Sequence, residues 1–148
     1  MKSFLDGLFG AKSRLSPLER CLLDTVRQHL CGDIAMRWDQ QVTAINKVQR
    51  LPDGVESDFY RMQGGKPSFN PMIAFPNQAT ELLVAMLKLT LIGTPHRLSV
   101  QIWAVDGYIF SIEYTGGSKY FEEAMSMDPP ARMDIQCELV ADLAESTR

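Results

Sequence analysis

Residues 102–117, IWAVDGYIFSIEYTGG, constrain the fold more than any other stretch of this sequence. Asp106 and Gly107 stand between two runs rich in β-branched and aromatic residues. Such a pair is the strongest local signal for a two-residue hairpin loop with a type I′ turn. The stretch therefore predicts two antiparallel strands, and it assigns Asp106 to the turn rather than to catalysis.

The flanking residues of this hairpin predict an unusual surface. Uninterrupted pairing away from the turn places Trp103 opposite Phe110, with Tyr108 and Tyr114 on the same face and Glu113 on the other. Both faces are then apolar near the turn, whereas a sheet with one solvated face alternates apolar and polar residues. Both faces must therefore be buried by other parts of the chain or by another molecule. An aromatic surface that the chain itself buries only in part is typical of an interface.

A capped helix is predicted over residues 16–32, SPLERCLLDTVRQHLCG. Ser16 suits the N-cap, Pro17 the first helical position and Glu19 the third, which together form a capping box. An apolar stripe recurs at helical spacing and indicates packing on a sheet. The stripe consists of Leu18, Leu22, Val26 and Leu30.

Residues 33–50 predict a strand, because Ile34, Met36 and Trp38 alternate with polar or small residues. Residues 55–62 are expected to return beside it as the first hairpin. Residues 63–77 contain three prolines and predict a loop or an extended edge, since proline cannot donate to a sheet ladder.

Three later segments complete the pattern. Residues 79–93 favour a short helical turn or an extended start followed by a strand over 83–92, with a second helix as the alternative. Residues 118–130 predict one short helix, which Pro129 and Pro130 end. Residues 132–143 alternate and predict a strand, although their Ala, Glu and Leu content also permits a terminal helix.

These elements predict a single α+β domain over residues 16–148. A capped N-terminal helix packs on an antiparallel sheet of about five or six strands built from sequential hairpins. Residues 1–15 form a tail or a short amphipathic segment outside it. A chain of 148 residues is long enough for one self-standing core.

Charge narrows the class of function. The net charge is −3, and residues 101–148 hold nine acidic but only three basic residues. No basic residue lies between Arg97 and Lys119, so a phosphate backbone on the aromatic hairpin would meet Asp106 and Glu113 uncompensated. We therefore expect no nucleic-acid partner. A membrane role is unexpected, because no apolar run approaches the length of a bilayer span.

The sequence contains no recognisable catalytic or metal-binding signature. The cysteines, at positions 21, 31 and 137, lack metal-type spacing and predict small buried side chains in a reducing cytoplasm. Neither His29 nor His96 has a second ligand at metal-site spacing. We expect no metal and no cofactor.

The resulting prediction is a non-enzymatic protein-binding module. Its most concrete version is a cytoplasmic, bacterial-type immunity protein that inhibits a basic toxin or effector by covering its active site. Two alternatives remain: a homodimer through the aromatic face, and a small hydrolase-like enzyme with Glu113, Asp106 or His96 in a pocket. The predicted partner-binding residues are Trp103, Tyr108, Phe110, Glu113, Tyr114, Glu122, Glu123 and Asp128.

Overall fold

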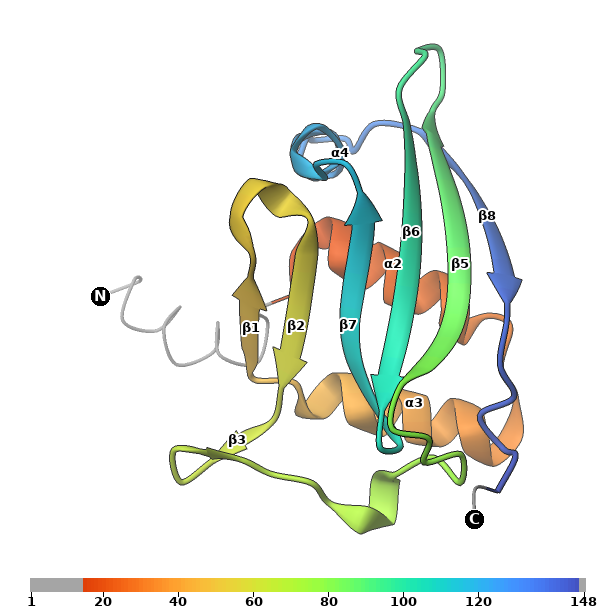
Figure 1. Cartoon of the computed structure of the whole chain (residues 1–148). Coiled ribbons are helices and arrows are strands. Elements are labelled where there is room, and N and C mark those ends of the chain that lie inside the picture. The colour runs from red at the N-terminus through yellow and green to blue at the C-terminus, as the bar shows by residue number, and fades with distance from the viewer. Residues whose placement is uncertain (1–14, 147–148) are drawn as a thin grey trace.

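The computed structural model describes residues 15–146 and consists of one large sheet with two long helices on one of its faces (Figure 1). The helices are α2 (Pro17–Arg27), α3 (Gly32–Ala44) and the short α4 (Lys119–Met125), with two 3-10 turns, η1 (Pro52–Gly54) and η2 (Pro71–Ile73). The strands are β1 (Lys47–Arg50), β2 (Glu56–Tyr60), β3 (Met62–Gln63), β4 (Lys66–Pro67), β5 (Leu82–Leu91), β6 (Arg97–Val105), β7 (Tyr108–Thr115) and β8 (Met133–Leu139).

The predicted α+β fold is confirmed. Six strands form one antiparallel sheet in the order β1-β2-β7-β6-β5-β8, and β3 and β4 form a separate two-stranded ribbon. Sequential hairpins account for β1-β2 and for β5-β6-β7. The pairings of β2 with β7 and of β5 with β8 are non-local. They bring side by side residues that are 53–57 positions apart in the first case, from Asp58↔Ser111 to Glu56↔Glu113, and 42–54 apart in the second, from Leu91↔Met133 to Ala85↔Leu139.

The first helix begins as the sequence predicts. The Ser16 side chain accepts from the backbone N–H of Glu19 at 3.1 Å, and Glu19 Oε1 accepts from the backbone N–H of Ser16 at 2.8 Å. Leu18, Leu22 and Val26 are fully buried against the sheet. The helix ends at Arg27, earlier than the predicted limit.

The prediction of a strand over residues 33–50 is wrong for its first twelve residues. Residues 32–44 form helix α3, and only β1 remains extended. Ala35, Trp38 and Val42 are buried at helical spacing, whereas Met36, which the alternation placed beside Trp38, is 58% exposed. The period-two pattern was accidental, and packing of the 3.6-residue stripe on the sheet decided the conformation.

The central hairpin has the predicted turn but a different register. Asp106 and Gly107 both have positive φ, at 54° and 95°, as a type I′ turn requires. Val105 pairs with Tyr108 and Ala104 with Ile109, but Trp103 then pairs with Ser111. Phe110 is therefore the extra residue of a β-bulge, and the predicted opposition of Trp103 and Phe110 is wrong.

The bulge exchanges the faces of two residues. Beyond it, Tyr114 pairs with the core residue Val100, and Glu113 pairs with Gln101 on the opposite face. Tyr114 is 6% exposed and belongs to the core. Because side chains alternate along a strand, one inserted residue moves every later side chain to the other face.

The rest of the predicted layout is largely confirmed. Residues 82–91 form strand β5 rather than a second helix, and residues 133–139 form strand β8 rather than a terminal helix. The predicted short helix is α4. The expected N-terminal segment, residues 1–15, lies almost entirely outside the described residues.

Candidate functional site

In the described part of the chain, one face of the sheet has no helix packed on it. Helices α2 and α3 lie together behind the sheet, and the viewer in Figure 1 looks onto the other side. Along β6 the even-numbered residues from Leu98 to Ala104 are buried, and the odd-numbered ones are half-buried or exposed. We call this second side the open face. It includes Lys47, Glu56, Asp58, Tyr60, Met86, Lys88, Gln101, Trp103, Phe110, Ser111, Glu113 and Glu138.

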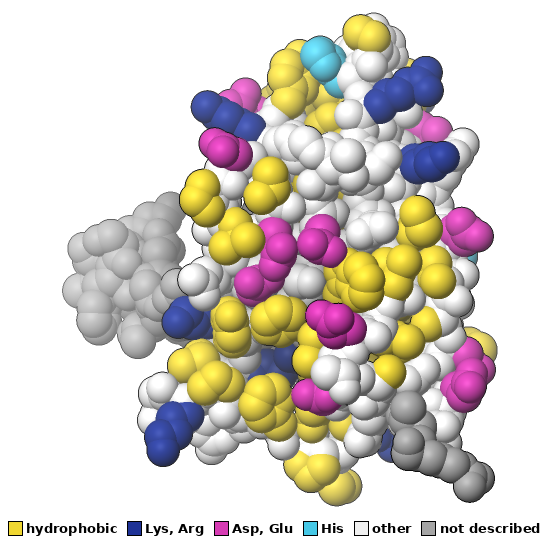
Figure 2. Space-filling model, viewed as in Figure 1, with side chains coloured by type: hydrophobic (Ala, Val, Ile, Leu, Met, Phe, Trp, Pro, Cys, Tyr) yellow, Lys and Arg dark blue, Asp and Glu magenta, His cyan; other side chains and the backbone are white. Residues whose placement is uncertain are grey.

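Three carboxylates gather at the centre of the open face. Glu56 on β2 lies directly opposite Glu113 on β7, and Asp58 lies opposite Ser111, whose other neighbour is Trp103. Side chains directly opposite in antiparallel strands have Cβ atoms about 5 Å apart. We call Glu56, Asp58 and Glu113 the acidic cluster. Figure 2 shows acidic side chains together near the middle of this face, with hydrophobic side chains around them.

The acidic cluster is not neutralised by the described residues. None of the ion pairs formed within residues 15–146 includes Glu56, Asp58 or Glu113. The pKa of Glu56 is raised to about 7 by a hydrogen bond with Asp58, then by burial and by the charge of Asp58. Glu56 is therefore partly protonated near neutral pH, as a carboxyl group crowded by another carboxylate can be.

Aromatic rings border the acidic cluster. Phe110 meets Tyr60 edge to face with ring centroids 5.7 Å apart, and Phe69 lies 5.5 Å from Tyr108. The ammonium of Lys47 lies 5.6 Å from the centroid of the Tyr60 ring. The rings thus form a ready surface for apolar groups and for cations, which bind to the faces of aromatic rings.

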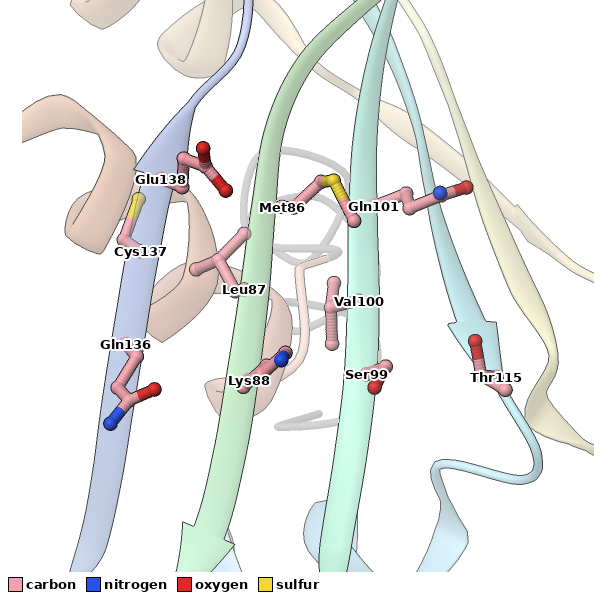
Figure 3. A pocket seen from close by; sticks show the side chains of 10 residues that line it. All are labelled: Met86, Leu87, Lys88, Ser99, Val100, Gln101, Thr115, Gln136, Cys137 and Glu138. Carbon is pink, nitrogen blue, oxygen red and sulfur yellow. The ribbon is translucent and has the colours of Figure 1, made fainter.

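A shallow hollow of about 330 Å³ continues the open face over β5, β6 and β8. Figure 3 shows Met86 and Gln101 side by side on neighbouring strands, with Glu138 on β8 and Lys88 farther along β5. By register, Glu113, Gln101, Met86 and Glu138 form one row across four strands. The hollow is therefore an extension of the acidic cluster.

The structure brings together only some of the predicted site residues. Trp103, Phe110 and Glu113 share the open face, and Tyr108 lies beside Phe69 at its end, 7% exposed. The predicted place of Tyr114 on this face is wrong. Glu122, Glu123 and Asp128 lie on or after α4, beyond the end of β7 rather than among the open-face strands (Figure 1).

Glu122 belongs to a buried polar network behind the sheet. Glu19 is fully buried and accepts from Arg50 Nη2 at 2.7 Å and from the hydroxyl of Ser57 at 2.6 Å. The Ser16 hydroxyl donates to Glu122 Oε2 at 2.9 Å. Burial is the main cause of the raised pKa of Glu122. This network joins α2, β1, β2 and α4, and its geometry is that of a structural element.

The three residues considered for a hydrolase-like site lie apart. Asp106 is in the turn after β6, and His96 precedes the opposite end of the same strand, where its ring lies 4.0 Å from that of Tyr120. Glu113 lies on the open face between these two ends. Within residues 15–146, no three His, Cys, Asp or Glu side chains are placed to hold a metal ion. The helices in that range are all too short or too polar to cross a bilayer.

Sequence reasoning missed Glu56, Asp58, Tyr60 and Arg61. In ESDFY the polar Glu56 and Asp58 alternate with the buried Ser57 and Phe59, which was a usable signal for one solvated face. The pairing of β2 with β7 was not readable, because nothing local specifies a contact across so long a separation. Comparisons with protein-family models, curated proteins and solved structures found no match to this chain.

Proposed function

We propose that this chain is a protein-binding module whose open face docks a basic segment of another protein. The observation that carries the proposal is the acidic cluster of Glu56, Asp58 and Glu113 beside Trp103, without an ion pair in residues 15–146. A Lys or Arg from a partner relieves the repulsion among these carboxylates. Its aliphatic stem packs on the neighbouring rings.

The most concrete form of this function is inhibition of a basic toxin or effector, in the manner of an immunity protein. A rigid sheet that covers a partner's active site needs anchors and complementary charge, and it needs no catalytic group of its own. We place this activity in the cytoplasm, a compartment supported by the three free cysteines.

The proposal makes the binding reaction proton-linked. Because the pKa of Glu56 is about 7, part of the population carries a proton at neutral pH. A cation placed at the cluster favours the ionised carboxylate and expels that proton. Binding near pH 7 is therefore expected to release protons, and calorimetry in buffers of different ionisation enthalpy measures their number.

The test is co-expression of the tagged chain with the products of neighbouring reading frames. We expect a one-to-one complex with a basic product, weakened at least about tenfold by Glu113→Lys, since truncation or reversal at a buried charge pair typically costs 2 kcal/mol or more. Glu123→Lys, the same charge change on the exposed side of α4, is the matched control and should leave affinity unchanged.

Three results would overturn the proposal. One is the absence of any protein partner whose binding depends on Glu113 or Trp103. A second is equal loss of binding in the Glu113 and Glu123 variants. The third is a tight homodimer in light scattering that Trp103→Ala dissociates, because the open face would then be buried against a second copy of the chain.

A further inference from the structure

Arg61 is a buried cation at the end of the open face. It follows β2 directly and is only 8% exposed. Its Nε donates to the backbone carbonyl of Gln41 at 3.3 Å, and its guanidinium lies 5.8 Å from the centroid of the Tyr108 ring. Its Nη2 is buried without a hydrogen-bond partner.

No carboxylate within residues 15–146 forms an ion pair with Arg61. Burial lowers the pKa of Arg61 to about 10, so the group still carries its charge at neutral pH. A guanidinium has five N–H donors, and a buried charge is normally paired because desolvation is costly. Residues 15–146 by themselves thus leave this cation undercompensated.

Arg61 is one of the residues that line a small aromatic pocket. Tyr60, Phe69, Tyr108 and Phe110 are among the residues that line it, and its volume is about 130 Å³. An apolar cavity of about 150 Å³ holds one benzene molecule. The pocket is slightly smaller than that cavity, so its scale suits at most a single ring-sized group. In Figure 2, Lys or Arg atoms are visible at the bottom of a recess among hydrophobic side chains in the lower part of this face.

We infer that the pocket beside Arg61 binds a carboxylate joined to one ring-sized apolar group. The planar guanidinium fork matches the two oxygens of a carboxylate, and the aromatic walls match the apolar group. Asp106 also lines the pocket, which disfavours doubly charged anions such as phosphate esters. Two sources carry this chemistry: a free aromatic acid, and the carboxyl-terminal residue of a polypeptide.

The test uses 3-phenylpropionate and its neutral amide as probes of the full-length chain, with binding followed by NMR at Tyr108 and by calorimetry. We expect the acid to bind at least about tenfold more tightly than the amide, because a charge-assisted hydrogen bond contributes roughly 1.5–3 kcal/mol. A peptide ending in a free Phe carboxylate, compared with its C-terminal amide, forms the second arm.

The two arms separate the sources. Tighter binding of the free-carboxylate peptide than of phenylpropionate identifies a polypeptide terminus, and the reverse order identifies a small acid. Arg61→Gln should abolish the preference for acid over amide. If that variant does not fold, Phe69→Ala should still weaken binding, because Phe69 lines the pocket and is 64% exposed.

Met72→Ala is the matched control, since Met72 lies in the same segment, is 78% exposed and does not line the pocket. Equal affinity for acid and amide, or equal effects of Phe69→Ala and Met72→Ala, would refute the inference. So would the lack of any binding to millimolar probe. Glu113→Lys is expected to retain acid binding, so this site and the proposed protein-binding function can fail independently.

Discussion

Glu56 and Glu113 lie directly opposite each other on neighbouring strands of the open face, with Asp58 two residues away. Like charges in such positions destabilise a sheet. The acidic cluster is thus maintained at a cost to the isolated protein. That cost is the physical reason to expect a cationic partner.

Stability should fall as the pH rises through the titration of Glu56. The pKa of this group is about 7 in the folded chain against 4.5 ordinarily, so the folded state binds more protons than the unfolded state between those values. Its stabilising contribution is complete below about pH 4.5 and is lost as the pH passes 7. Urea denaturation at pH 5 and pH 8 measures the difference.

The substitution Glu56→Gln should remove this part of the pH dependence and make the protein more stable at pH 8. Glu123→Gln, on the exposed side of α4, serves as the control and should leave the pH profile as in the wild type. An unchanged profile in Glu56→Gln would show that Glu56 is not the titrating group.

Removal of the buried carboxylate of Glu19 should be strongly destabilising. Glu19→Ala takes the reciprocal capping bond from Ser16 and removes the buried carboxylate that accepts from Arg50 Nη2 and from the Ser57 hydroxyl. Breaking a buried pair costs roughly 3–5 kcal/mol, and the half-exposed position of Arg50 puts the expected loss at about 3 kcal/mol. The surface pair of Arg27 with Asp39 is the comparison: Asp39→Ala should cost less than about 1 kcal/mol.

The hairpin turn should tolerate no side chain at Gly107. Its φ is 95°, and a Cβ there would lie 3.2 Å from the carbonyl oxygen of Phe75 and 3.0 Å from Gln78. Gly107→Ala is expected to cost about 2 kcal/mol or more. Gly64→Ala, also at positive φ but with open space around it, should cost less. Equal losses in chemical denaturation would mean that packing around the turn is unimportant.

Substitution of the two tryptophans should distinguish a residue needed for folding from a residue needed for partner binding. Trp38 is 1% exposed behind the sheet, and its ring stacks on that of Phe75. Trp38→Ala should lower the free energy of unfolding by about 3–5 kcal/mol. Trp103 is half-buried on the open face, and Trp103→Ala should lower stability much less while it weakens partner binding. Denaturation and calorimetry on both variants test this, and a larger stability loss at Trp103 would contradict it.

Local sequence determined the elements whose signals are complete within a few residues. The capping box of Ser16 and Glu19 provides hydrogen-bond acceptors for N–H groups at the start of its own helix. Asp106 and Gly107 adopt the two positive φ angles of their turn. Strands β5 and β8 likewise follow from alternation. The conformation of helix α3 was predicted wrongly because Ile34, Met36 and Trp38 fit a period of two. Only packing of Trp38 against the sheet selects the helical face.

Tertiary structure alone decided which residues form the candidate site. The bulge at Phe110 moved Glu113 onto the aromatic face and Tyr114 into the core, a shift of one residue that no local pattern specified. The pairing of β2 with β7 then placed Glu56 and Asp58 beside Glu113, and the loop after β4 placed Phe69 over Tyr108. The sequence by itself determined a capped helix and a tight hairpin. Non-local strand pairing determined the acidic cluster and the pocket of Arg61, because contacts across long loops depend on how the whole core packs.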